Sequence, residues 1–296
     1  MNKRTYLAAA CLLPILLSAQ TNEPQLWGKC TLDDFQKTPY SEWYSKNHAE
    51  YEPNPAIVEQ LRDFNWKDYS VTVFLGTWCG DSRREVPRFV KALDAAGFPQ
   101  HAITVIALSA EDSVYKQSVT REERGRHIYR VPTFIISKKG SEVNRIVEIP
   151  AVSLERDLLA ILNGKYTPNY ESYIYLSQWF DEGILNDSNI SHRGLSRQIK
   201  HLTQSVGELN TFGYVLSKSG SEGLDAAINV FKINTYLYPE AWQPQMSLAE
   251  ALYDRGDGEQ ALKAIQKALE LNKDVRNVKS LIALEDKIKI LTTTAH

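Results

Sequence analysis

Short apolar runs alternate with amphipathic stretches through about a hundred residues in the first half of the chain. Runs rich in apolar β-branched residues predict two buried strands, at 71–76 and 102–108, and two further strands joined by a hairpin turn, at 131–137 and 142–149. Segments with polar or helically spaced apolar positions predict helices at 81–97, 118–129 and 153–164. The resulting order, β-α-β-α-β-β-α, predicts a compact α/β domain with a central mixed sheet and helices on both of its faces.

The strand signals fade after residue 166, and the chain from 171 to 294 reads as helical. Three positions recur 34 residues later with similar side chains: Ala227, Phe231 and Leu237 correspond to Ala261, Ile265 and Leu271. This period resembles that of tetratricopeptide (TPR) repeats, and the resemblance implies an all-α domain of stacked hairpins whose groove binds a peptide or protein. We expect the first copy to carry extra residues in its turn. Two generic amphipathic hairpins are the alternative.

The first twenty residues have the three parts of a secretory signal peptide. Lys3 and Arg4 precede an apolar run from Leu7 to Leu17, and small residues follow. Cys11 raises the alternative of a lipoprotein, although most of the apolar run follows this cysteine. No later stretch is long and apolar enough to span a membrane. We therefore expect an exported protein, periplasmic if the source is bacterial, with secretion or surface association as the alternative.

These patterns divide the chain into six parts. They are a signal peptide at 1–20, an extension of short helices and turns at 21–66 that packs on the next domain, an α/β domain at 67–166, a helical connector at 167–208, two repeats at 209–276, and a capping helix at 277–296.

Composition excludes several function classes. The chain has 296 residues, 43% of them hydrophobic, and a net charge of -2, so it offers no basic surface for nucleic acid. The histidines are scattered, and neither an HExxH motif nor a Cys/His cluster is present, so we expect no metal site. We also expect no cofactor.

The candidate chemistry lies where the first predicted strand meets its helix, in the sequence TWCGDS. Cys79 stands at the predicted helix N-terminus, where unpaired backbone N–H groups and the helix dipole favour an anion and so make this thiol a better nucleophile. Gly80 leaves the sulfur unscreened. Ser82, one turn further on, can donate a hydrogen bond to a thiolate.

The segments WCGDS and Val131-Pro-Thr-Phe together resemble the two signature loops of the thioredoxin superfamily, over roughly residues 68–166. The resemblance implies that Cys79 is the nucleophile and that Pro132 is a cis proline lying against the sulfur. It implies that Val131 pairs with a bound peptide through its backbone. Trp78 and Gly80 beside the nucleophile, and Thr133 in the second loop, complete the implied substrate-binding set.

Two departures limit the likeness. Ser82 stands where the family has its second cysteine, and Val73 stands where many thioredoxins bury an aspartate. A single thiol can form a mixed disulfide but cannot complete a dithiol reduction alone. Three routes remain open: an external thiol resolves the adduct, the adduct persists as a trap or sensor, or Cys30 resolves it.

Two hypotheses follow. In the first, the protein is a monothiol thiol–disulfide oxidoreductase in which Cys79 attacks, Ser82 stabilises the thiolate and Pro132 supports the peptide. Its partners are protein thiols or disulfides or a small thiol, and the repeats recruit a protein. In the second, the α/β domain is a redox-silent scaffold and the repeats mediate protein binding in the cell envelope. A peroxide-reducing thiol is a third option, for which we find no accompanying threonine and arginine.

Overall fold

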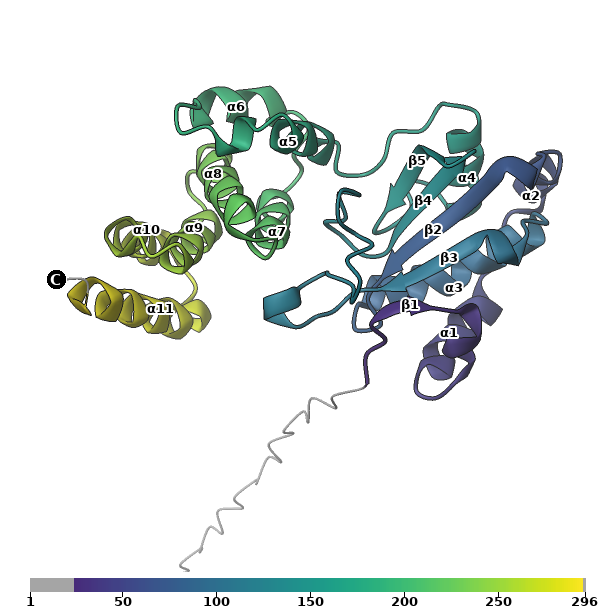
Figure 1. Cartoon of the computed structure of the whole chain (residues 1–296), viewed down its shortest axis with the longest axis horizontal. Helices are drawn as coiled ribbons and strands as arrows, with labels where there is room; N and C mark the ends of the chain where they lie inside the picture. Colours follow the sequence, from purple (N-terminus) through teal and green to yellow (C-terminus); the bar gives the residue numbers. More distant parts are fainter. Residues whose placement is uncertain (1–23, 295–296) are drawn as a thin grey trace, which may run out of the picture.

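The computed structural model describes residues 24–294, which form a sheet-containing half followed by a helical half. Figure 1 shows the two halves side by side, with the end of the chain at the far side of the helical half. The predicted signal peptide lies outside the described residues. Among the described residues, no helix is both long enough and apolar enough to cross a membrane.

A five-stranded mixed sheet forms the centre of the first half, in the order β1-β3-β2-β4-β5. Its strands are β1 (Gly28–Cys30), β2 (Tyr69–Leu75), β3 (Ile103–Ala107), β4 (Thr133–Lys138) and β5 (Ser141–Val147). The pair β2–β3 is parallel and the other pairs are antiparallel. The four apolar runs thus form strands, and β4 and β5 form the expected hairpin. The edge strand β1 comes from the extension, where we expected only helices and turns.

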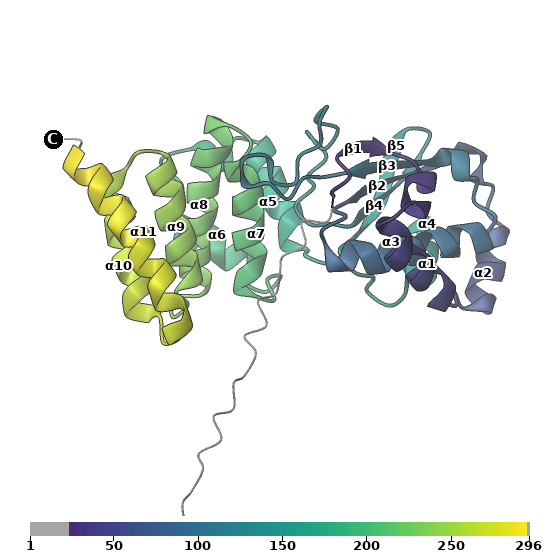
Figure 2. The ribbon, with the colours of Figure 1, turned by 90° about the horizontal axis from the view of Figure 1, so that it is seen from below.

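Four helices pack against one face of this sheet (Figure 2). They are α1 (Tyr40–Glu50), α2 (Pro55–Arg62), α3 (Gly80–Ala95) and α4 (Leu154–Leu162). Alternate strand residues such as Val73 and Phe134 are fully buried beneath them. The prediction of helices on both faces is therefore wrong.

The opposite face is covered by a long connection that we call the covering loop, residues 108–132 between β3 and β4. Its Leu108, Ile128 and Val131 are buried against the alternate strand residues Phe74 and Ile135. The helix predicted at 118–129 does not form, and this segment consists of turns. Arg121, Gly125 and His127 have positive φ angles there, which a right-handed helix does not permit.

Pro87 lies inside α3, where it has no N–H to donate to the carbonyl of residue 83. The side chain of Asn47 on α1 donates to the Arg83 carbonyl oxygen instead, at 3.3 Å. The extension thus supplies a hydrogen bond that the proline removes, which helps to hold α1 against the helix that follows Cys79.

The second half contains seven helices among the described residues: α5 (Ser172–Asp181), α6 (His192–Ile199), α7 (Val206–Ser217), α8 (Ser221–Leu237), α9 (Gln243–Asp254), α10 (Gly258–Leu271) and α11 (Val275–Thr294). Helices α7 and α8 form one close pair, and α9 and α10 form the next. Ala227 and Ala261, the matching small residues of the 34-residue period, are both fully buried.

The extra residues of the first hairpin lie in its second helix, not in its turn as we expected. Three residues separate the helices in each pair, 218–220 in the first and 255–257 in the second. Helix α8 has 17 residues, whereas α10 has 14. Close approach within the first pair depends on Gly213, since a Cβ there would lie 2.4 Å from the Phe231 ring.

The covering loop also joins the two halves. Tyr129 is 5% exposed and belongs to the apolar core of the helical half. Its ring centroid lies 3.9 Å from that of Phe212 on α7 and 5.6 Å from that of Tyr173 on α5. One segment therefore packs on both the sheet and the helices.

Candidate functional site

Cys79 occupies the N-cap of α3, four residues beyond the end of β2. The intervening turn is closed by the Cys79 amide, which donates to the Gly76 carbonyl oxygen at 2.9 Å. The Cys79 carbonyl accepts the first helical hydrogen bond, from Arg83 N–H at 3.0 Å. The buried strand and the helix end thus fix the backbone that carries the thiol.

The thiol of Cys79 faces the loop that precedes β4. Its Sγ lies 3.2 Å from the Val131 carbonyl oxygen, to which it donates a hydrogen bond. The Val131–Pro132 peptide bond is cis, as the family resemblance implied. The sulfur accepts no capping hydrogen bond from the first-turn N–H groups of α3, and its own proton is donated to the second loop.

Access to the sulfur is open on the side of Gly80. Cys79 is half-buried, Gly80 is exposed, and a Cβ at Gly80 would meet no atom within 4 Å. Pro132 and Thr133 are buried, and the Thr133 hydroxyl donates to the Arg130 carbonyl oxygen at 2.7 Å. Thr133 therefore supports the second loop from within, while Gly80 leaves room for a partner.

Trp78 covers the ends of β2 and β3. Its indole N–H donates to the Leu108 carbonyl oxygen at 2.9 Å. The ring passes directly over Gly76, where a Cβ would lie 2.5 Å from it. The Tyr115 ring of the covering loop lies against the same indole, with 5.8 Å between ring centroids. The tryptophan therefore links the thiol-bearing turn to the covering loop.

Ser82 is fully buried behind the turn, and its hydroxyl oxygen accepts a hydrogen bond from Gly76 N–H at 3.2 Å. The same hydroxyl still has its own proton to donate. That it donates this proton to a Cys79 thiolate stays a prediction. Ser82 lies beside the turn that carries the thiol, one helical turn beyond Cys79.

The structure does not bring Cys30 next to Cys79. Both cysteines are free. Cys30 lies on the edge strand β1, with its Sγ 3.9 Å from the Val105 carbonyl oxygen, and packs on the helix-covered side of the sheet. Cys79 packs with the cluster on the other side. Burial and the nearby Asp34 raise the pKa of Cys30 to about 12, which makes it a poor resolving thiol in this arrangement.

A buried lysine stands close to the site, and the sequence patterns did not single it out. Lys116 of the covering loop is 5% exposed, and its Nζ donates to the Tyr129 carbonyl oxygen at 2.7 Å. Burial and Arg130 lower the pKa of Lys116 to about 8, against the opposing effects of Glu148 and Cys79.

Lys116 should make stability depend on pH in a measurable way. Between pH 8 and the ordinary lysine value of 10.5, the folded protein has lost this proton while the unfolded chain keeps it. The unfolded state then binds more protons, so the free energy of unfolding rises with pH. We expect urea unfolding from pH 7.5 to 9.5 to show this rise relative to Lys116→Met. The exposed Lys279→Met is the control, and equal slopes in all three proteins would contradict the assignment.

The helical half holds the covering loop beside the thiol through polar contacts as well. Arg130, next to Val131, donates to Glu148 at 2.8 and 2.9 Å and to the Tyr173 hydroxyl at 3.0 Å. The Gln117 amide donates to the Lys218 carbonyl oxygen at 2.6 Å. These contacts join residues far apart in the sequence. The covering loop, which lines the candidate site, is therefore held in place by both halves of the protein.

Within residues 24–294, no group of three or more His, Cys, Asp or Glu side chains is placed to hold a metal ion. No protein-family model matches the chain, and no curated protein and no solved structure is significantly similar to it. The residues around Cys79 are therefore the basis on which a function can be assigned.

Proposed function

We propose that this chain is an exported thiol–disulfide exchange protein with a thioredoxin-like domain and a TPR-type helical domain. The observation that carries the proposal is the position of one accessible sulfur. Cys79 Sγ lies at the N-terminus of a helix, 3.2 Å from the carbonyl oxygen of the residue before a cis proline. This is the arrangement expected from the WCGDS and Val131-Pro132 likeness.

The chemistry is exchange by a single thiol. The Cys79 thiolate attacks one sulfur of a partner disulfide, a new S–S bond forms to Cys79, and the other partner sulfur leaves as a thiolate. A second thiolate, from a small thiol or another protein, then attacks the mixed disulfide and releases Cys79. No net oxidant is needed, because one disulfide is exchanged for another.

The side chains have distinct tasks in this scheme. The N-terminus of α3 and the Lys116 side chain place N–H donors and positive charge near the Cys79 sulfur. Val131 and Pro132 offer backbone against which a partner's chain can lie, and Gly80 leaves the approach clear. Because Cys30 faces the other side of the sheet, we assign the second step to an external thiol.

The helical half supports the partner-recruiting part of the proposal. Its paired helices bury two of the three recurring positions of the 34-residue period, Ala227 with Ala261 and Phe231 with Ile265, which is the packing expected of TPR-type hairpins. Contacts between this half and the covering loop would place a recruited protein near Cys79.

Oxidised glutathione provides the direct test, in a full-length chain with Cys11 replaced by serine. We expect one glutathione adduct by intact mass in this protein and in its Cys30→Ser variant, and none in Cys79→Ser. Reduced glutathione should then remove the adduct. Equal adduct formation after loss of Cys79 would contradict the proposal.

A redox-silent scaffold is the second candidate, favoured by one observation. The thiol proton is already donated to Val131, and the sulfur packs against an apolar cluster. If the native chain forms no adduct but reacts fully in urea, this scaffold function replaces the first one.

A further inference from the structure

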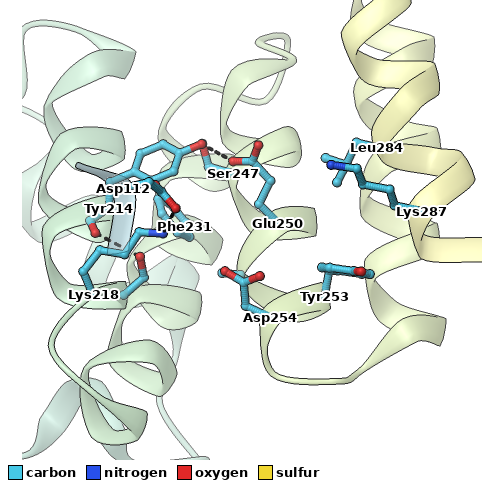
Figure 3. A pocket seen from close by; sticks show the side chains of 12 residues that line it. Asp112, Tyr214, Lys218, Phe231, Ser247, Glu250, Tyr253, Asp254, Leu284 and Lys287 are labelled. Carbon is cyan, nitrogen blue, oxygen red and sulfur yellow. Dashed lines mark hydrogen bonds and ion pairs between the residues drawn. The ribbon is translucent and has the colours of Figure 1, made fainter. Parts of the chain in front are cut away.

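The helical half contains a pocket of about 270 Å³ that is walled mainly by α7, α9 and α11 (Figure 3). Tyr214 of α7, Glu250 and Asp254 of α9 and Lys287 of α11 line it. Asp112 of the covering loop contributes to the same wall, where its carboxylate pairs with Lys218 at 2.8 Å. At this size, the pocket suits one or two side chains better than a drug-sized molecule.

Hydrogen-bond acceptors in this pocket outnumber the available donors. The Glu250 carboxylate accepts one hydrogen bond among the described residues, from the Tyr214 hydroxyl. Since a carboxylate has about four acceptor positions, most of those on Glu250 are vacant. Asp254, at the mouth, has neither a hydrogen bond nor an ion pair within the described part of the chain. Burial raises the pKa of both carboxyl groups, and Lys218 opposes this rise at each of them without reversing it.

A buried hydroxyl provides a separate observation. Ser247 is 1% exposed and lines the pocket, and its Oγ has no hydrogen-bond partner among residues 24–294. It lies beside the Tyr214 hydroxyl, which donates its one proton to Glu250 and so leaves the acceptor positions of Ser247 Oγ without a donor. An unpaired polar atom in such a place is costly unless a ligand or water pairs with it.

The positive groups of the pocket compensate for these oxygens only in part. Lys218 lowers the pKa of both carboxyl groups but makes its ion pair with Asp112, and Lys287 is exposed at the rim. Figure 3 shows the Glu250 and Asp254 side chains projecting from one helix toward the space in front of Lys218. The vacant acceptors match a group that carries several N–H donors and a positive charge, which a lysine ammonium or an arginine guanidinium supplies.

We propose that this pocket binds a Lys or Arg side chain of the partner protein. The proposal deepens the recruiting role given above to the helical half and rests on it. Asp112 at the pocket and Tyr115 against Trp78 are three residues apart, so their Cα atoms are separated by at most about 11 Å. A partner held by its basic residue is thereby kept near the thiol.

Fluorescence anisotropy with labelled tetra-lysine tests the site, with tetra-glutamine of the same label as the uncharged peptide. The protein is the full chain carrying Cys79→Ser, so binding is measured without thiol chemistry. We expect tetra-lysine to bind more tightly than tetra-glutamine. Glu250→Gln and Asp254→Asn should each weaken tetra-lysine binding about tenfold, while Glu259→Gln on the exposed face of α10 should leave it unchanged.

Other outcomes overturn the assignment. Equal binding of tetra-lysine to wild type and to both pocket variants would place the binding elsewhere. Spermidine that competes as strongly as unlabelled tetra-lysine would assign the pocket to a small polyamine instead of a protein. If Glu250→Gln fails to fold, binding of tetra-lysine to Asp254→Asn still tests the site, because Asp254 is exposed. Because glutathione exchange is measured separately, a failure here is distinguishable from failure of the thiol chemistry.

Discussion

Ser82→Cys is expected to convert the single-thiol site into a dithiol site that can be oxidised within one chain. Positions 79 and 82 are the N-cap and third residue of α3. Residues three apart at a helix start have Cα atoms about 5 Å apart, inside the range that a disulfide requires. The oxidised variant should weigh about 2 Da less than its reduced form and should reduce insulin disulfides with dithiothreitol at least about tenfold faster than wild type.

Two variants serve as controls for this change. Ser82→Ala keeps a single thiol and should show no gain, although leaving Gly76 N–H without its partner should cost about 1–3 kcal/mol of stability. Ser82→Cys combined with Cys79→Ser should lose the gained reductase activity. A Ser82→Cys protein that folds but never forms the internal disulfide would contradict the placement of the two side chains.

Tyr129→Ala should have the largest effect on stability, because it removes the main contact between the covering loop and the helical half. Tyr129 is 5% exposed and packs on Phe212 and Tyr173. Truncation of a buried aromatic side chain costs about 3–5 kcal/mol. Urea unfolding measures this loss, and the free energy of unfolding should fall by that amount.

Tyr175→Ala is the matched control on the helical half, since its side chain is 42% exposed. It should change stability by less than about 0.5 kcal/mol. Similar losses for both variants would mean that Tyr129 does not anchor the loop. A Tyr129→Ala protein that unfolds in two separate steps would further indicate that this contact couples the two halves.

Local patterns predicted the strands and most of the helices well. The apolar β-branched runs became β2 to β5, and two of the three residue pairs spaced by 34, Ala227 with Ala261 and Phe231 with Ile265, are buried in α8 and α10. These signals are strong because burial against one neighbouring layer imposes a regular spacing on the sequence. Strand β1 was missed because a three-residue edge strand has too few positions to show a pattern.

The conformation of the covering loop could not be predicted from the sequence, for a different physical reason. Its polar residues suggested a helix, yet the segment consists of turns that lie between the sheet and the helical half and bury Lys116 and Tyr129. Such burial depends on contacts with residues a hundred or so positions away, such as Lys218. The sequence identified Cys79, Val131 and Pro132 as neighbours through a family resemblance, but it gave no sign of the lysine beside them.

The central claim is that the Cys79 sulfur is reachable and more reactive than the other thiol of the same chain. Limited iodoacetamide labelling at pH 7.5, followed by peptide mass analysis, measures both cysteines in one sample of the Cys11→Ser chain. We predict that Cys79 is labelled at least about tenfold faster than Cys30, whose pKa is raised to about 12, and that the difference disappears in urea. Native Cys79 that is labelled no faster than Cys30 would contradict the account.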